Sequence, residues 1–261
     1  MKEKPARGVR WRLWATLAFS GVGLAASAWA AKELRHFSAT DKRFFLLPPD
    51  AETPGLGVAG VLYASPVRIE RVFERDFGRS VARVPLAERR RQLLAVDWVA
   101  DASVLRIWPN RIAVRIVERQ PVAFVSLPAR FERGPARLAL IDDDGVILET
   151  PARSRFSFPV LRGLSEKEPE TERARQVRLM QRIRRDVEPF GKTISEIDVG
   201  NPDNPLVTVE LEGRAVTLAL GDRNFRTRFQ NFLSHYPEIR KRLPEAGSFD
   251  LRLDDRITAK E

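Results

Sequence analysis

The longest uncharged stretch of this sequence, from Leu13 to Ala31, constrains the fold of the chain more than any other feature. At the helical rise of about 1.5 Å per residue, the stretch covers roughly the 30 Å hydrocarbon core of a bilayer. No second uncharged run of comparable length follows, so residues 32–261 are expected to lie in one aqueous compartment. The sequence therefore predicts a single transmembrane helix at residues 13–31.

Basic residues on both sides of this run predict its orientation. Five lie within residues 1–12, which the positive-inside rule assigns to the cytoplasm, and four follow between Lys32 and Arg43, so the margin is small. Small residues at 26–30 also fit a signal-peptide cleavage site. The run is longer than the usual secretory apolar region and carries Trp14 and Trp29 near its ends, which favours an uncleaved anchor.

Composition limits the chemistry that the exported part can perform. The chain has no cysteine, which excludes disulfides and thiolate metal sites, and its two histidines, His36 and His235, are far apart in the sequence. No GxSxG, HExxH or phosphate-binding glycine motif occurs, and Asp254 and Asp255 are adjacent, so in a strand they point to opposite faces. We expect no enzyme activity, no cofactor, no metal and no small-molecule substrate.

The formal net charge of +10 raises nucleic acid, anionic lipid and acidic proteins as partners. The arginine run at 89–91 is interleaved with acidic residues such as Glu88 and has no stacking aromatics, so a solvated helix face is favoured. Contact of that face with partner proteins or lipid headgroups is the weaker alternative. Nucleic acid is excluded as a partner if the domain is exported.

Residues 32–56 lack periodicity and contain Pro48, Pro49 and Pro54, which predicts a linker. A strand is then expected at 58–63, a helix from Ser65-Pro66 to Gly78, a second helix at 85–96, and a hairpin of two strands at 104–108 and 112–116. The order β-α-α-β-β within about 65 residues predicts an α+β fold with both helices on one face of a small sheet.

The second half of the exported part is predicted to be mainly antiparallel. Strands are expected at 122–127, 138–141, 194–199, 206–211 and 215–220, and amphipathic helices at 170–187 and 225–236 should pack on the sheet. The aspartates at 142–144 lack the alternating ligands of an EF-hand loop, so a solvated hairpin turn is favoured over a calcium site.

Several stretches resemble the FtsQ/DivIB family of bacterial cell-division proteins: 58–63, Val104–Pro109 with its Trp-Pro turn, Val114–Ala123 with its Glu-Arg-x-Pro-x-Ala pattern, and Phe249–Lys260 with its Asp-Leu-Arg strand. The resemblance implies a cytoplasmic N-terminus at 1–12, the transmembrane helix at 13–31, the linker at 32–56, a POTRA domain at 57–120 and an FtsQ-type β domain at 121–261.

The resemblance also implies a function. The chain is expected to be a single-pass type II protein of the bacterial inner membrane, located at the division septum, whose domains lie in the periplasm. Its β domain would bind FtsB, itself paired with FtsL, by strand addition to its last strand, and it would coordinate septum assembly and septal wall synthesis. The implied partner-binding residues are Arg252, Leu253, Asp255, Arg256, Ile257, Thr258, Ala259 and Lys260.

Alternatives stay open at this stage. Arg252 could instead pair within the chain with Asp250 or Asp254, and Ile257 and Ala259 could be ordinary core residues. The alternative function is that of another POTRA-containing protein, of outer-membrane assembly or secretion. Such proteins normally carry a transmembrane barrel after their POTRA domains, and the sequence here shows no series of alternating lipid-facing strands.

Overall fold

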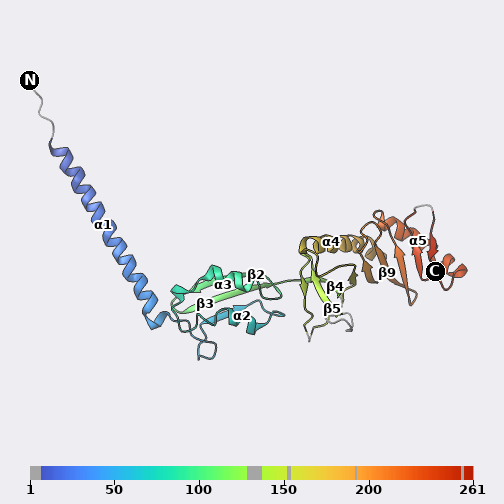
Figure 1. Cartoon of the computed structure of the whole chain (residues 1–261), viewed down its shortest axis with the longest axis horizontal. Coiled ribbons are helices and arrows are strands. Elements are labelled where there is room, and N and C mark those ends of the chain that lie inside the picture. Colours follow the sequence, from blue (N-terminus) through green and yellow to red (C-terminus); the bar gives the residue numbers. More distant parts are fainter. Residues whose placement is uncertain (1–6, 128–136, 152–153, 192, 254–255, 261) are drawn as a thin grey trace, which may run out of the picture. The chain divides into compact units, whose positions relative to one another are not determined.

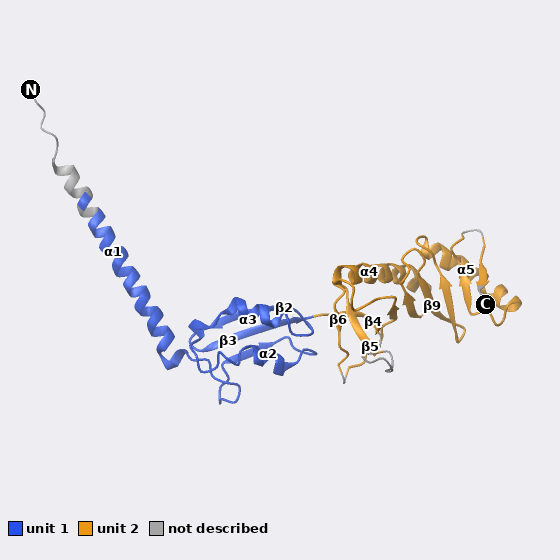
Figure 2. Cartoon of the chain, viewed as in Figure 1, with its two compact units in different colours: residues 1–118 blue, residues 119–261 orange. Residues whose placement is uncertain are grey.

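The computed structural model describes residues 7–127, 137–151, 154–191, 193–253 and 256–260 (Figure 1). The chain divides into two compact units, residues 1–118 (unit 1) and 119–261 (unit 2) (Figure 2).

Unit 1 begins with a long helix, α1 (Arg7–Thr40), which contains the whole uncharged run. Large apolar side chains on it are exposed, including Phe19 at 81% and Leu24 at 73%. Over the described residues, neither α1 nor any other helix is long and apolar enough to cross a membrane.

The structure differs from the predicted linker at 32–56. Helix α1 continues to Thr40, a short 3₁₀ helix η1 (Lys42–Phe44) follows, and Leu46 is fully buried. The Leu46 N–H donates to the Arg79 carbonyl (2.8 Å), and Ser80 Oγ donates to the Ser38 carbonyl (2.5 Å). These long-range contacts attach the segment to unit 1, and no local periodicity in the sequence reports them.

The rest of unit 1 confirms the predicted order β-α-α-β-β. Its elements are β1 (Leu56–Ala59), α2 (Pro66–Val72), η2 (Val81–Arg83), α3 (Leu86–Leu93), β2 (Val99–Ile107) and β3 (Arg111–Glu118). The sheet order is β1-β3-β2, with β1 parallel and β2 antiparallel to β3. Strand β1 ends before the predicted Tyr63, because Gly60 adopts a φ of +84° that breaks the extended backbone.

The predicted N-terminal cap of α2 is confirmed, but the helix ends at Val72 and not at the predicted Gly78. The predicted solvated face of α3 is wrong for Arg89. Ser65 accepts from the Arg68 N–H, and Pro66 occupies the first turn. The Arg89 side chain is buried against Asp76, with Nε···Oδ2 and Nη2···Oδ1 distances of 2.5 and 3.0 Å. The hydrogen bond with Asp76 raises the pKa of Arg89. A sequence pattern could not reveal this partner, because Asp76 lies beyond the end of α2.

Unit 2 holds one nine-stranded sheet of order β12-β11-β10-β9-β8-β7-β4-β5-β6 in the described residues. Its elements are β4 (Pro121–Leu127), β5 (Arg137–Asp142), β6 (Ile147–Leu148), β7 (Val160–Arg162), α4 (Glu170–Val187), η3 (Glu188–Phe190), β8 (Ile194–Asp198), β9 (Leu206–Leu211), β10 (Arg214–Ala219), α5 (Phe225–Arg242), β11 (Ser248–Asp250) and β12 (Thr258–Lys260). The helix predicted at 170–187 has the bounds expected, and the one predicted at 225–236 continues to Arg242.

The sheet is mainly antiparallel, as predicted, but not a simple meander. Pairs β4·β7, β7·β8 and β10·β11 are parallel. Parallel neighbours need a crossover, which α4 provides between β7 and β8 and α5 provides between β10 and β11. The two helices consequently lie on the same side of the sheet (Figure 1).

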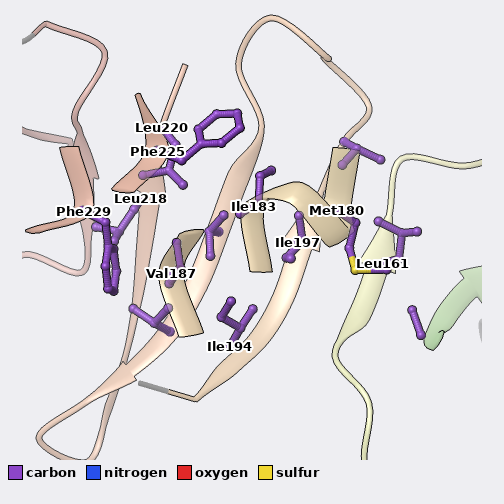
Figure 3. Packing of buried hydrophobic residues seen from close by; sticks show 14 of the residues in the cluster. Leu161, Met180, Ile183, Val187, Ile194, Ile197, Leu218, Leu220, Phe225 and Phe229 are labelled. Atoms are coloured by element: carbon purple, nitrogen blue, oxygen red, sulfur yellow. The ribbon is translucent and has the colours of Figure 1, made fainter. Parts of the chain in front are cut away.

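The core of unit 2 lies between these helices and the sheet. Figure 3 shows Met180, Ile183 and Val187 of α4 and Phe225 and Phe229 of α5 facing strand residues, and the exposed fraction of each of these five side chains is zero. The strand residues that meet them include Leu161, Ile194, Ile197, Leu218 and Leu220. Burial of this apolar surface holds both helices, and with them strands β8 and β11, in place.

Glu118 and Arg119 are adjacent at the boundary between the units, and each makes contacts within its own unit. The Glu118 carboxylate accepts the backbone N–H groups of residues 62–64 at 2.7 to 2.9 Å, within unit 1. Arg119 pairs with the buried Asp142 (2.7 Å) in unit 2, and Asp142 also accepts the Val146 N–H. These contacts give a physical role to both the Glu-Arg pattern and the acidic hairpin turn.

Candidate partner-binding surface

The carboxyl-terminal strand lies at one edge of the nine-stranded sheet. Strand β12 pairs antiparallel with β11 in the register Ser248↔Lys260, Phe249↔Ala259 and Asp250↔Thr258. Among the described strands β11 is its only partner, and no described side chain hydrogen-bonds to the β12 backbone. The outward N–H and C=O groups of this strand are therefore open to another chain.

Strand β11 supports this edge from inside. Phe249 is 1% exposed, and its ring centroid lies 5.2 Å from that of Phe232 and 6.5 Å from that of Tyr236, both on α5. Since β11 is also parallel to β10, the edge strand rests on a strand that is fixed by the core.

Arg252 pairs within the chain, as the alternative interpretation proposed. Its Nε donates to Asp250 Oδ1 (2.9 Å) and its Nη2 to Asp250 Oδ2 (2.6 Å). The hydrogen bonds to Asp250, together with the charge of that carboxylate, raise the pKa of Arg252. The side chain is half exposed, and its Nη1 has no hydrogen bond to any described residue. One end of the guanidinium thus faces away from Asp250.

The other predicted contact residues divide into groups. Leu253 is 54% exposed, and Arg256 and Thr258 are exposed as well. Ile257 and Ala259 are partly buried against the core, so the core-packing alternative holds for part of their surface. Asp255 lies outside the described residues, and Lys260 is described as a β12 residue through its pairing with Ser248.

Two depressions flank the terminal segment. One, of about 530 Å³, lies between α5 and the segment after β11, and is lined on the helix side by polar residues such as Asn231 and Ser234 and on the other by Leu251, Leu253 and Ile257. The second, of about 560 Å³, is lined by Leu243, Pro244 and Ala259 among others. The sequence did not predict the helix residues, because polar positions on an amphipathic helix are expected to face solvent.

Among the residues that the structure describes, no cluster of three or more histidine, cysteine, aspartate or glutamate side chains could hold a metal ion. The acidic turn of the β5–β6 hairpin is instead occupied by Arg119, which lies 2.7 Å from Asp142 and 3.6 Å from Asp144.

Comparison with known families agrees with this architecture. Residues 57–119 match the model of the FtsQ-type POTRA domain, and residues 129–252 match that of the C-terminal part of cell division protein FtsQ/DivIB. Glu118 and Arg119 are the last two residues of the POTRA match.

Individual relatives carry the same name. The chain is 37% identical over 206 residues to cell division protein FtsQ of Koribacter versatilis, which covers 77% of this chain and 57% of that protein. It is 24% identical over 165 residues to that of Actinobacillus pleuropneumoniae, covering 62% of each. The chain thus spans about three fifths of the length of these relatives. With both domains matched in order, the chain belongs to the FtsQ/DivIB family of cell division proteins.

Proposed function

We propose that this chain is a non-enzymatic scaffold of the division machinery that binds the FtsB/FtsL complex through the β12 edge and thereby coordinates septum assembly and septal wall synthesis. The observation that carries the proposal is the open backbone of β12 (Thr258–Lys260), which is supported by the buried strand β11. A partner strand that pairs with this edge satisfies its free N–H and C=O groups and extends the sheet.

Backbone pairing supplies affinity for any extended chain, so specificity must come from side chains. Arg252 lies two residues after β11, and its Nη1 is available to a carboxylate of the partner while Nε and Nη2 bind Asp250. A guanidinium can bind two carboxylates at different edges, so a partner acid would fix the register without breaking the internal pair.

We further propose that α1 anchors the chain in the inner membrane, with the N-terminus in the cytoplasm and both units in the periplasm. The run from Leu13 to Ala31 has no ionisable residue. The described large side chains of this run are exposed and do not pack on the rest of unit 1. Trp14 and Trp29, near the two ends of the run, are 69% and 68% exposed. Exposed apolar surface of this extent favours a lipid environment.

The non-enzymatic role is supported by the use of the ionisable groups. The described aspartates that are most deeply buried, Asp76 and Asp142, each pair with an arginine and maintain local structure. The alternative of outer-membrane assembly or secretion is not carried further, because both matching family models are of FtsQ type.

The test is a binding assay of residues 32–261 with FtsB and FtsL ectodomains. The variants Thr258→Pro and Ala259→Pro form a matched pair, because successive N–H groups of a strand point in opposite directions. The N–H and C=O groups of Phe249 face β10, so Ser248 and Asp250 bond to β12 and the N–H of Ala259 points outward. Ala259→Pro therefore removes an outward N–H and should abolish binding while thermal stability is kept. Thr258→Pro removes an N–H of the β11 ladder and should lower stability.

The variant Arg252→Glu tests the specificity contact separately and is expected to weaken binding by at least tenfold. Failure of the unmodified chain to bind either ectodomain would overturn the scaffold proposal. If both proline variants bind normally, the edge is not the site, and if Arg252→Glu binds normally, only that contact is wrong. For the anchor, a compartment-specific reporter fused after Glu261 must be active in the periplasm and inactive in the cytoplasm.

A further inference from the structure

The outer face of α4 carries a straight row of exposed arginines, which we call the α4 arginine row: Arg175, Arg178, Arg182 and Arg185. Their spacing of three, four and three residues places all four within an arc of about 80° on a helix that turns 100° per residue. They extend along about 15 Å of the axis. The opposite face of α4 is buried in the core, so the row points away from the sheet.

Most of the row is not neutralised by the chain itself. Arg175 pairs with Glu172 (2.6 Å), but both side chains are largely exposed. Arg182 lies over the Phe225 ring, 5.2 Å from its centroid. Arg178 and Arg185 have no hydrogen bond or ion pair with any described residue. The other two arginines of the helix, Arg173 and Arg184, bind backbone carbonyls and Glu188 respectively.

A row of this kind is unfavourable for the helix that carries it. Arg175 and Arg178, Arg178 and Arg182, and Arg182 and Arg185 are like-charged neighbours at three- or four-residue spacing, where repulsion destabilises a helix. Surface helices usually alternate charge at these positions, as Glu172 and Arg175 do. A ligand of opposite charge would remove the repulsion.

We propose that the α4 arginine row binds an acidic α-helical segment of a partner protein, whose carboxylates repeat at the same three- and four-residue spacing. Two helices side by side share one rise per residue, so each arginine can meet a carboxylate along the whole row. Same-face residues of an extended chain repeat every 6.6 to 6.8 Å and fall out of step. A second copy of this chain is a poor partner, because its net charge is also +10.

This surface goes beyond the proposed strand addition. It uses no residue of β11 or β12 and requires no extended segment of the partner. Binding through it should depend strongly on salt, because its charges are exposed and screened over about 10 Å at 0.1 M ionic strength. Binding at the β12 edge, which relies on backbone hydrogen bonds, should depend on salt much less.

The experiment uses the full chain in zwitterionic nanodiscs and two fluorescent, stapled 21-residue helical peptides of identical composition. In the striped peptide, glutamates occupy positions i, i+3, i+7 and i+10, and in the control peptide the same glutamates are distributed around the helix. Fluorescence anisotropy measures the affinity of each. We expect the striped peptide to bind at least fivefold more tightly than the control at low salt.

The variant Arg178→Gln/Arg185→Gln is expected to lose roughly three- to tenfold in affinity for the striped peptide, as the loss of two exposed charge pairs predicts. A matched control, Arg111→Gln/Arg115→Gln, removes two exposed arginines of β3 and should bind normally. The Thr258→Pro and Ala259→Pro variants should also bind normally, which separates this surface from the proposed function.

Three results would overturn the inference. The two peptides could bind equally, the row variant could retain full affinity, or vesicles containing phosphatidylglycerol could bind in a row-dependent manner while the striped peptide does not. The last result would assign the row to a membrane surface instead of a helix.

Discussion

In unit 1, helix α3 directs arginines toward its own domain, whereas in unit 2, helix α4 directs a row of arginines outward. Arg89 of α3 is buried against Asp76. Its neighbour Arg90 donates from Nε to the Ala102 carbonyl of β2 (2.7 Å) and pairs with Asp101 (2.6 Å). Arg178 and Arg185 of α4 have no comparable partner among the described residues.

The edges of the two sheets differ in the same way. Strand β2 pairs only with β3 in the described sheet, yet its register shifts between Val99 and Asp101, and the N–H and C=O of Ala102 are taken by the side chains of Asp101 and Arg90. Such bulges and charges prevent edge-to-edge association. The register of β12 with β11 shows no such shift, and no described side chain hydrogen-bonds to the β12 backbone. The difference indicates that the β2 edge is protected against strand addition and the β12 edge is not.

The largest expected effect comes from removing the support of the open edge. Phe249→Ala deletes a buried ring beneath β12 and should lower the free energy of unfolding of unit 2 by about 3–5 kcal/mol. All five tryptophans lie in residues 1–118, so unit 2 unfolding should appear in far-UV circular dichroism without a change in tryptophan emission. The control Leu253→Ala, at a 54% exposed site, should change stability little. A coincident tryptophan transition would show that the units do not unfold independently.

Removing the buried Asp76–Arg89 ion pair of unit 1 is expected to lower the free energy of unfolding slightly less. Asp76→Ala removes both hydrogen bonds from the buried Arg89 guanidinium to a carboxylate and leaves only the partly exposed Glu88, at 3.7 Å, as a counter-charge, so it should destabilise unit 1 by roughly 3 kcal/mol. Here the transition should be visible in the emission of the buried Trp98. Arg91→Ala, at an exposed position of the same helix, is the matched control and should leave the transition in place. Equal effects of the two substitutions would mean that burial of Arg89 contributes nothing to stability.

A smaller effect is expected from a substitution that makes the β2 edge open, as the β12 edge is. Arg90→Ala frees the Ala102 carbonyl and should lower the stability of unit 1 by roughly 1 kcal/mol, the value of one hydrogen bond. Because β2 would then offer an unpaired edge group, self-association of the chain should increase in sedimentation velocity experiments. A strictly monomeric variant would argue that the bulge at Asp101 alone closes this edge.

The sequence predicted the elements whose cause is local. Helix α4 has the expected bounds because Val177, Met180 and Ile183 repeat at helical spacing after an acidic first turn. The N-terminal cap of α2 and the hairpin of β2 and β3 depend on neighbouring residues in the same way. Strand β7 was not predicted, since three residues are too few to show a period, and its parallel pairing with β4 and β8 depends on the crossover helix.

The candidate site was predicted only in outline. The position of β12 at an edge follows from the family resemblance and is confirmed in the sheet order. The partner of Arg252 was open between two aspartates, because residues 250 and 254 are equally near in sequence, and only the turn after β11 selects Asp250. The α4 arginine row was not predicted, because its outward direction requires knowing which face of α4 the core buries.

The smallest expected effect tests whether repulsion within the α4 arginine row destabilises the helix when no ligand is bound. Arg178→Gln/Arg185→Gln removes like-charge repulsion at three- and four-residue spacing and should stabilise unit 2 by a few tenths of a kcal/mol at low salt. The gain should vanish at 1 M salt, because the Debye length is then only about 3 Å and the repulsion is screened. Far-UV circular dichroism at both salt concentrations measures it, with Arg111→Gln/Arg115→Gln as the control for general charge reduction. A destabilised variant would mean that the two arginines make favourable contacts within the chain, and the contrast between α3 and α4 would then be lost.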